Sequence, residues 1–491
     1  MFLEIAAGAF LLSDFIYHRF NEDEPVQKKG PIEVGIPRTD EGAPVPMLFG
    51  KTLVRQPVLA WAYCTNINGT TSANVIMFFV VAIGCDDGNG TNQIHGVRVG
   101  DDDRGTGWTQ TGDGLELTTV GQLGIVVETL NGNSSQVLAE DGDTFSDAPT
   151  YTGRAMIAKG VPHAEIGGYR GYLSICLLTI AGGGGGEEDP FGGWSISQGA
   201  STPAIAFEAS SRHTPTGPMG VWSVVGSDMN VANAIYLLLV QKFGAAGLDS
   251  SRIDTTTFES AAYHLHTESQ GCSMTINQAR SADEYIKDLL RQIDGALDEN
   301  PATGKVELRL VRADFDPNQI SEINRSNTVK LLGFAAGGWT DVVNKIRVLF
   351  MDRDNKYQDG SVTAQNQGNS AAQDSNEEQI IEMPYVHEEN LARAIANREL
   401  QARSRPLTKM RAMCGRWAIR LMRGDPVRVV WSKPDIAGRI FRVANVERGT
   451  LEDGAVAVDL VEDFNYTHRN KTPRPPVGGL VLTPPTDVFG G

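Results

Sequence analysis

Short apolar pieces with β-like alternation fill the chain from residue 31 to about residue 180. The stretch NVIMFFVVAIG, residues 74–84, is apolar and β-branched, as expected of a buried strand. In IHGVRVGDDD, residues 94–103, Val97 and Val99 share one face and Arg98 takes the other. Residues 31–225 therefore predict a β-rich region and not an alternating βαβ domain.

The pattern becomes helical after residue 225. In NVANAIYLLLVQKFGAAG, residues 230–247, one helical stripe carries Val231, Ile235, Leu238, Leu239 and Lys242, and Gly244 can end the helix. In SADEYIKDLLRQIDGAL, residues 281–297, Ser281 and Glu284 have capping-box spacing. A turn then leads to a strand whose apolar residues, Val306, Leu308 and Leu310, alternate with Glu307 and Arg309. Residues 226–334 are thus predicted to be an α/β middle region.

A second β-rich region is predicted over residues 335–466. It opens with the strand VVNKIRVLFMD, residues 342–352, and a polar stretch at 358–378 that predicts a long loop. EENLARAIANRELQARS, residues 388–404, predicts a helix with Glu389–Arg393 and Glu399–Arg403 at i,i+4 spacing. Further strand-like text follows, and a Pro-rich tail at 467–491 is predicted to be an arm or a linker.

The first 30 residues predict an amphipathic helix or arm. Glu4 and Asp14 interrupt its apolar run, no basic segment precedes that run, and the run is too short to cross a bilayer. The helix is expected to dock either on its own chain or on a partner.

Charge and cysteine content narrow the function classes. The 491-residue chain has a net charge of −17, which disfavours general adhesion to nucleic acid or anionic membrane. Residues 393–448 hold 14 Lys or Arg against 4 Asp or Glu, so this segment is +10 and the remainder −27. Pairing of this segment with acidic surfaces of its own or a neighbouring subunit is favoured over DNA contact. The five cysteines are Cys64, Cys85, Cys176, Cys272 and Cys414; they are widely spaced and predict reduced thiols and a cytoplasmic folding environment.

Gly50, Lys51 and Thr52 spell the end of a phosphate-binding loop, but the rest of the motif is missing. The required upstream glycine is Val45, flanked by Pro44 and Pro46, which have no N–H to offer a phosphate. The text after Thr52 is strand-like, so a turn between strands is expected. The glycine run at 182–186 precedes three acids and no helix start, which favours a surface loop over an anion site.

Other candidate chemistry is equally sparse. His264 and His266, with Glu268 beyond, would share a face on a strand and could hold a metal, but half-buried polar histidines are the favoured interpretation. CDDGNGTN, residues 85–92, fails the calcium-loop spacing and predicts a turn. No GxSxG, HExxH or strand-linked GxGxxG occurs. Acidic residues are numerous, so a pair of glycosidase carboxylates stays open as an alternative, although no pattern singles one out. The expectation is no catalytic, cofactor-binding or metal residue and no enzyme activity.

The segments PVPMLFG at 44–50, PTYTGRAMIA at 149–158 and LVEDFNY at 460–466 stand in this order along the chain, with the helix at 230–247 and residues 281–317 between the last two. This ordered set resembles the tail-tip hub (tip attachment, baseplate hub) proteins of long-tailed bacteriophages and gene transfer agents. PVPMLFG at 44–50, followed by Pro57 and Trp61, is similar to the family's PVPxxYG segment, with Phe49 in place of Tyr. IHGVRVGDD and PTYTGRAMIA match the next hairpin and a YxGxA strand. The helix at 230–247 matches NPAxxxYxLL…GxG, with Val231 where Pro is common. Residues 281–317, WTDVVNKIRVLFMDRDNKYQ at 339–358 and LVEDFNY at 460–466 complete the set.

The resemblance implies an α+β, β-rich fold with two related β-barrel hub domains that assembles as a homotrimeric ring. It implies a virion protein at the tail tip that caps the tail tube, adapts sixfold to threefold symmetry and passes DNA through its lumen. Implied partners are a distal tail protein or tube ring, the tape-measure protein, and tail fibre or tip proteins, without stable membrane insertion or cofactors. The chain has no spare length for the hydrolase domain of some relatives, and it stops at Gly491, so host recognition is expected to fall to another protein. A receptor- or carbohydrate-binding adhesin and a cell-wall hydrolase are the alternatives.

Overall fold

The computed structural model describes residues 46–55, 57–66, 75–85, 92–99, 102–103, 109–111, 114–117, 125–131, 173–182, 205–211, 218–240, 246–276, 280–338, 342–431, 436–449 and 454–464. The chain divides into two compact units, one of Met1–Leu310 with Val343–Leu400 and one of Val311–Val342 with Gln401–Gly491. These units cut across the predicted ranges 226–334 and 335–466, whose boundaries stay a prediction. The predicted N-terminal helix at 1–30 and the tail at 467–491 lie outside the described residues.

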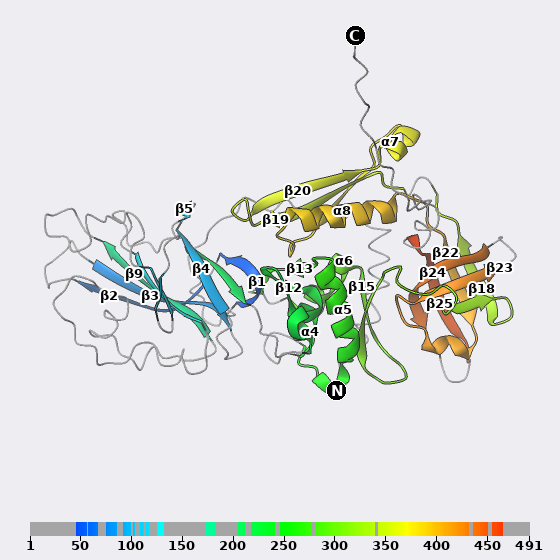
Figure 1. Ribbon diagram of the computed structural model, residues 1–491, viewed down its shortest axis with the longest axis horizontal. Coiled ribbons are helices and arrows are strands. Elements are labelled where there is room, and N and C mark those ends of the chain that lie inside the picture. The colour runs from blue at the N-terminus through cyan, green and yellow to red at the C-terminus, as the bar shows by residue number, and fades with distance from the viewer. Residues whose placement is uncertain are drawn as a thin grey trace, which may run out of the picture. The chain divides into compact units, whose positions relative to one another are not determined.

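An 11-stranded sheet contains most of the described β structure of the first unit (Figure 1), in the order β5-β4-β10-β1-β3-β9-β8-β7-β6, with β2 paired to β3 and β14 to β1. Ten of its strands come from the predicted β-rich region: β1 Met47–Val54, β2 Val58–Asn66, β3 Val75–Cys85, β4 Asn92–Val99, β5 Asp102–Asp103, β6 Thr109–Thr111, β7 Gly114–Leu117, β8 Ile125–Asn131, β9 Leu173–Gly182 and β10 Ile205–Ser211. The apolar β3 pairs with β2 on one side and β9 on the other. The predicted β-rich character of this region is confirmed; the PTYTGRAMIA segment lies outside the described residues.

Strand β1 changes partners halfway along. Its first three residues pair with β14, Met274–Ile276, and its second half pairs with β10 from Gly50 onward. Gly50 has a φ of 63°, a left-handed conformation that an L-residue adopts at a cost. The Gly50-Lys51-Thr52 segment therefore lies inside strand β1, so the expected turn between two strands is wrong, and the next described element is again a strand.

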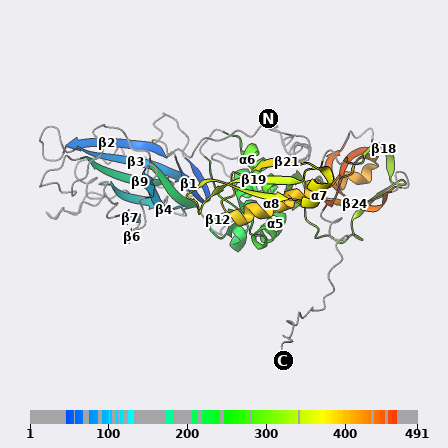
Figure 2. The ribbon, with the colours of Figure 1, turned by 90° about the horizontal axis from the view of Figure 1, so that it is seen from above.

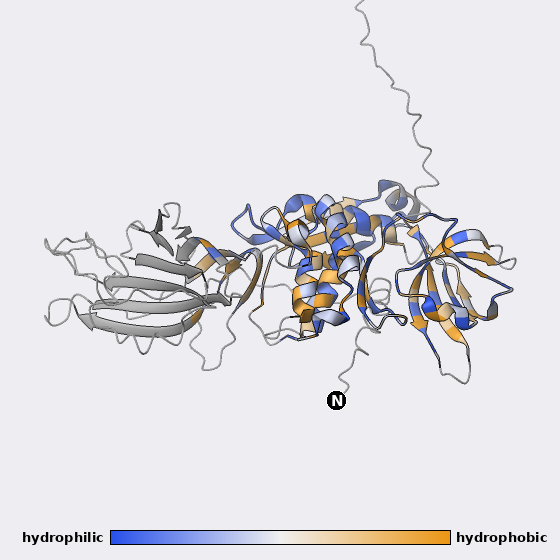
Figure 3. Ribbon diagram, turned by 60° about the horizontal axis from the view of Figure 1, so that its bottom comes forward, coloured by the Kyte–Doolittle hydropathy of each residue, from blue (hydrophilic) through white to orange (hydrophobic). Residues whose placement is uncertain are grey.

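Three helices and several short strands form the middle of the first unit. These elements are η3 Gly220–Ser223, β11 Val224–Val225, β12 Asp228–Asn230, α4 Val231–Val240, η4 Ser250–Arg252, α5 Thr255–Thr267, β13 Gly271–Cys272, α6 Ala282–Ile293, β15 Gly295–Glu299 and β16 Val306–Leu310. Figure 3 shows apolar and polar residues interleaved along these helices, and their apolar faces meet in one core that includes Ile235, Leu238, Phe258, Leu265 and Leu289. Lys242 and Gly244 of the predicted stripe lie outside the described residues.

Local sequence explains how α6 begins. The Ser281 hydroxyl accepts a hydrogen bond from the Glu284 amide at 3.4 Å, as an N-cap residue should. The Glu284 carboxylate binds Arg280 at 2.8 Å. The predicted hairpin follows, with β15 antiparallel to β16. Its predicted alternation fails at Glu307, which is 5% exposed, because Asn300 and Arg309 bind its carboxylate.

The first unit also contains a three-stranded sheet covered by a long helix (Figure 2). Strands β19 Lys345–Asp352, β20 Gln358–Gln365 and β21 Glu378–Glu382 are ordered β20-β19-β21, and α8 Glu389–Arg403 packs on them through a shared apolar core. The predicted strand and helix are confirmed. Arg393 forms the predicted ion pair with Glu389, and the buried Glu399 contacts Arg398 at 3.3 Å.

The predicted long loop at 358–378 is wrong. This stretch contains β20 and the helix α7 Gln367–Gln373, which the Asn366 side chain caps by accepting from the Asn369 amide. Strand β20 lies at the edge of its sheet, and its only buried residues are Val362 and Ala364, which share one face; the others are polar residues and one glycine. A strand with so little apolar content has the composition of a loop.

The second unit is built on a six-stranded sheet, ordered β17-β23-β24-β25-β22-β18. Its elements are β17 Ser321–Asn324, β18 Thr328–Ala335, β22 Lys409–Cys414, η6 Arg416–Arg420, β23 Pro426–Trp431, β24 Ile436–Glu447 and β25 Val456–Glu462. The first and last strands in this order, β17 and β18, are consecutive in sequence and joined by a three-residue turn, so the sheet must curl until its two edges approach. The predicted α+β, strand-rich class is confirmed with this half-barrel, while two related barrels stay a prediction.

Candidate functional site

A buried polar cluster joins three parts of the first unit. At its centre, Asp228 of β12 accepts hydrogen bonds from the Ser273 hydroxyl at 2.5 Å and from the Arg353 guanidinium. Arg353 also donates to the backbone carbonyl of Lys51 at 3.2 Å and lies 3.6 Å from Glu388. The segment after β19 is thereby tied both to β1 and to the short strands of the middle region.

Gly50 is required where β1 crosses this cluster. A Cβ at this position would lie 2.3 Å from the Ser273 hydroxyl, 2.7 Å from the Cys272 carbonyl oxygen and 2.9 Å from the Met229 amide nitrogen. Real side chains essentially never approach that closely, and backbone atoms cannot move aside as a flexible side chain can. The glycine that resembles part of a phosphate loop thus serves close packing of backbone against backbone.

A second layer of polar contacts surrounds Arg353. The Tyr357 hydroxyl donates to Glu208 at 2.8 Å, and Lys51 lies 3.2 Å from the same carboxylate. Burial tends to raise the pKa of Glu208, but the Tyr357 hydrogen bond and the Lys51 charge outweigh it and lower that pKa. Burial, with the neighbouring Glu208 charge, raises the pKa of Tyr357, which stays a neutral donor.

His387 completes the cluster as a neutral imidazole. Burial, followed by the nearby Arg353 charge, lowers its pKa to about 3. Its ring meets the Tyr357 ring edge-on at 5.7 Å between centroids. The histidine therefore packs as an uncharged ring at neutral pH.

This cluster is arranged to hold elements together. Ser273 is fully buried, and its hydroxyl donates to a carboxylate that an arginine already neutralises, so the oxygen is neither activated nor accessible as a nucleophile. Arg353 shares its N–H groups among two side chains and a backbone carbonyl. Buried polar contacts of this kind between distant segments favour one packing of the surrounding elements.

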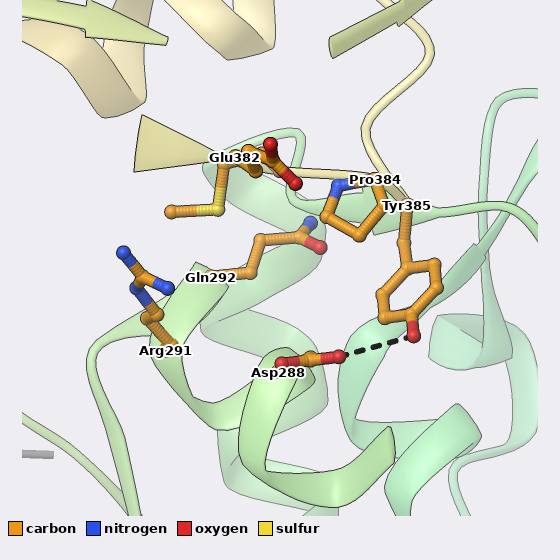
Figure 4. Close-up of a pocket in the computed structure, with 7 residues that line it drawn as sticks. Asp288, Arg291, Gln292, Glu382, Pro384 and Tyr385 are labelled. Carbon is orange, nitrogen blue, oxygen red and sulfur yellow. Dashed lines mark hydrogen bonds between the residues drawn. The ribbon is translucent and has the colours of Figure 1, made fainter. Parts of the chain in front are cut away.

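A small pocket opens beside α6 (Figure 4). Asp288, Arg291, Gln292, Glu382, Pro384 and Tyr385 line it, and Tyr385 donates to Asp288 at 3.1 Å. Arg280 binds Asp288 at 3.2 Å and Tyr385 at 3.2 Å, which neutralises the carboxylate. The space suits about one water molecule and no larger ligand.

The predicted candidate residues do not converge. His264 and His266 lie on helix α5, not on a strand, and His266 bonds the Val224 carbonyl at 3.0 Å. Among the described residues, no group of three or more His, Cys, Asp or Glu side chains is placed to bind a metal. Residues 86–91 of the predicted turn and 183–186 of the glycine run lie outside the described residues. Cys272 and Cys414 are buried free thiols.

Several basic residues of the segment 393–448 are paired with acids of the same chain. Arg398 binds Asp294 in the first unit, and Arg411 and Arg442 bind Glu447 and Asp463 in the second. These contacts agree with the predicted pairing within the chain. Within the described ranges, no helix is both long and apolar enough to span a bilayer.

Sequence reasoning missed the polar cluster. Arg353 and Tyr357 stand in the RDNKYQ part of a segment that supported the family resemblance, which was a usable signal. Their partners Asp228, Ser273 and Glu208 are 80 or more residues away, and no local pattern marks them as neighbours.

The comparisons with known proteins point to tail proteins. Residues 281–446, from the N-cap of α6 into β24, match the model of a family described as a putative phage tail protein. The chain also aligns with a chain from the virion of a native gene transfer agent particle, with a TM-score of 0.57, 13% identity and 92% of each chain covered. The two chains share a fold. No curated protein matches significantly.

Two further solved structures align over most of their length. The tail protein from Neisseria meningitidis MC58 has a TM-score of 0.33 and 9% identity, with 85% of this chain and 98% of that chain covered. The 43 kDa tail protein of prophage MuSo2 from Shewanella oneidensis has a TM-score of 0.29 and 11% identity, with 89% and 98% covered. The family model over residues 281–446 and the fold shared with the gene transfer agent virion chain confirm the predicted resemblance to phage and gene transfer agent tail proteins, whereas membership of the tail-tip hub family stays a prediction.

Proposed function

We propose that this chain is a structural protein of a phage or gene transfer agent tail, and specifically its tail-tip (baseplate) hub. The proposal rests chiefly on the fold shared with a gene transfer agent virion chain over 92% of both chains. The tail-family match over residues 281–446 supports the same assignment.

In this role the chain forms a homotrimer that caps the tail tube and adapts sixfold tube symmetry to a threefold tip. The curled six-stranded sheet of the second unit supports the assignment, because ring-forming hub domains are expected to be small barrels. The expected neighbours are a distal tail protein or tube ring, the tape-measure protein, and fibre or tip proteins.

The acidic charge of the chain suits a channel for DNA. A basic lumen would bind phosphates strongly and hold the passing duplex, whereas acidic walls let it slide. The chain has a net charge of −17. We infer that acidic residues dominate the lumen, and a map of lumen-facing residues with a net basic character would contradict this.

The mass of the assembled particle, measured by light scattering at low and at physiological salt, tests the proposal. A species near three times 53.0 kDa supports the trimeric hub. A monomer at both salt concentrations favours the adhesin alternative. Binding of the protein to host cells would support that alternative. Clearing of peptidoglycan, abolished by changing one carboxylate, would instead identify a cell-wall hydrolase.

A further inference from the structure

Strand β18 of the half-barrel presents an unusual outer face. It lies at one end of the sheet order, and Val329 and Leu332 on it are 67% and 41% exposed. Both are aliphatic side chains that folding normally removes from water.

Two β-bulges put these side chains outside. The β18–β22 register passes from Thr328 to Lys330 and from Leu331 to Gly333, so it skips Val329 and Leu332. Leu331 and Phe334 stay on the inner side and pack on the core. Bulges re-aim side chains and recur next to functional surfaces. Here each bulge aims one aliphatic residue at solvent, with the exposed Lys330 between them.

The first unit carries a second exposed apolar patch, on η3 and α5. Val221 is 70% exposed and Tyr263 50% exposed. Trp222 follows Val221 in sequence. Its ring lies 5.1 Å from the Tyr263 ring and 5.1 Å from the His266 ring, between centroids. The exposed Glu259 stands one helical turn before Tyr263, on the same face of α5.

The two surfaces are complementary in chemistry. Aromatic and aliphatic side chains anchored in a rigid setting are typical of interface hot spots. A lysine flanked by Val329 and Leu332 fits an aromatic patch bordered by a carboxylate, because the ammonium is attracted both to the rings and to the acid. The net charges of the two units also have opposite signs. By sequence the first unit carries 25 basic and 47 acidic residues, and the second carries 18 basic and 13 acidic residues.

We propose that the β18 face of one copy of this chain docks on the η3–α5 patch of a second copy, with Lys330 facing Glu259. The contact is heterologous, since two different surfaces meet, and repetition of such a contact forms a ring when the rotation between copies closes. The inference rests on the self-assembly in the proposed function and specifies which surfaces make it.

Cysteine cross-linking between separately purified variants tests the contact. Val221→Cys and Val329→Cys proteins are mixed in equal amounts and oxidised, and non-reducing electrophoresis reports species of twice 53.0 kDa. The matched control mixes Val329→Cys with Ile380→Cys, which is also an exposed aliphatic position of the first unit. Each variant and the wild type oxidised alone give the background from native cysteines.

The expected result is at least about fivefold more dimer in the first mixture than in the control, because docking raises the local thiol concentration. Equal yields in the two mixtures overturn the proposal. If the wild type is then still a trimer by mass, only this contact is wrong and the hub proposal stands.

A charge swap gives independent evidence without cysteines. Lys330→Glu is expected to weaken self-association about tenfold, since it places two carboxylates together, and Glu259→Lys in the same chain is expected to restore it. Failure of the second change to restore an association that the first weakened contradicts the Lys330–Glu259 pairing.

Discussion

Arg398 of α8 lies 3.1 Å from the carboxylate of Asp294, the residue that ends α6 more than 100 positions earlier. Asp294 is 1% exposed and adopts a left-handed conformation with a φ of 52°. The same guanidinium donates to the Gln292 carbonyl at 2.8 Å, so one arginine serves the helix terminus, where a cation is favoured, and the buried acid. This contact fixes the long helix over the middle region of the first unit.

Replacement of Arg398 by Met is expected to destabilise the first unit by about 3–5 kcal/mol, because it removes the guanidinium that faces the buried Asp294 carboxylate and the Gln292 carbonyl. Urea unfolding followed by tryptophan fluorescence measures the change. Arg393→Met is the matched control on the same helix: Arg393 and Glu389 are 62% and 55% exposed, and the expected cost is about 0–1 kcal/mol. Equal costs for the two variants would contradict the assigned role of Arg398.

Gly50→Ala is expected to prevent normal packing of β1. The added methyl meets two backbone atoms closer than 3 Å in addition to the left-handed conformation, so we expect a loss of several kcal/mol or misfolding. Gly226→Ala separates the steric clash from the cost of the left-handed conformation, since Gly226 has a φ of 59° and open space around it. This variant should therefore lose only about 1–2 kcal/mol of stability. Thermal melting of both variants checks the prediction, which fails if they melt together.

Stability is expected to fall in acid partly through His387. Its folded-state pKa of about 3 lies below its ordinary value, so the unfolded chain binds more protons between the two pH values. The contribution is complete above about pH 6.5 and is lost as the pH falls toward 3, on the order of 4 kcal/mol over the interval. Unfolding measured from pH 7 to pH 4 should show a shallower decline for His387→Gln than for the wild type.

Arg442 is expected to hold the half-barrel together in the same way that Arg398 holds α8. It binds the fully buried Asp463 at 2.6 Å, donates to the Gly424 carbonyl at 2.8 Å and stacks over Phe315. Arg442→Met should destabilise the second unit by about 3–5 kcal/mol. Arg439→Met, at a half-exposed position 3.8 Å from Glu462, should cost about 0–1 kcal/mol. Hydrogen exchange of β24 and β25 distinguishes the two variants, and similar protection in both would refute the prediction.

The local sequence pattern was sufficient to predict those helices and strands that their own residues specify. The Ser281 cap and the apolar stripe of α6, the β19 strand and the α8 helix were all predictable, because periodicity and capping act over a few residues. The same reasoning failed at 358–378, where β20 exists because β19 pairs with it along its full length and not because of its own composition. The resemblance to tail proteins was also readable, since it depends on the order of short segments.

Only the tertiary structure decided which residues that are far apart in the chain contact one another. The sequence by itself excluded a phosphate loop at Gly50, but the need for a glycine there arises from Ser273 and Cys272, which the fold brings against it. Asp228, Arg353 and Tyr357 are ordinary polar residues in sequence and become a buried network only when β1, β12 and β19 meet. Val329 and Leu332 look like core residues, and only the register of β18 on β22 turns them outward. Hydrophobic periodicity reports which residues prefer burial, whereas register, bulges and long-range pairing settle which of them are buried and beside what.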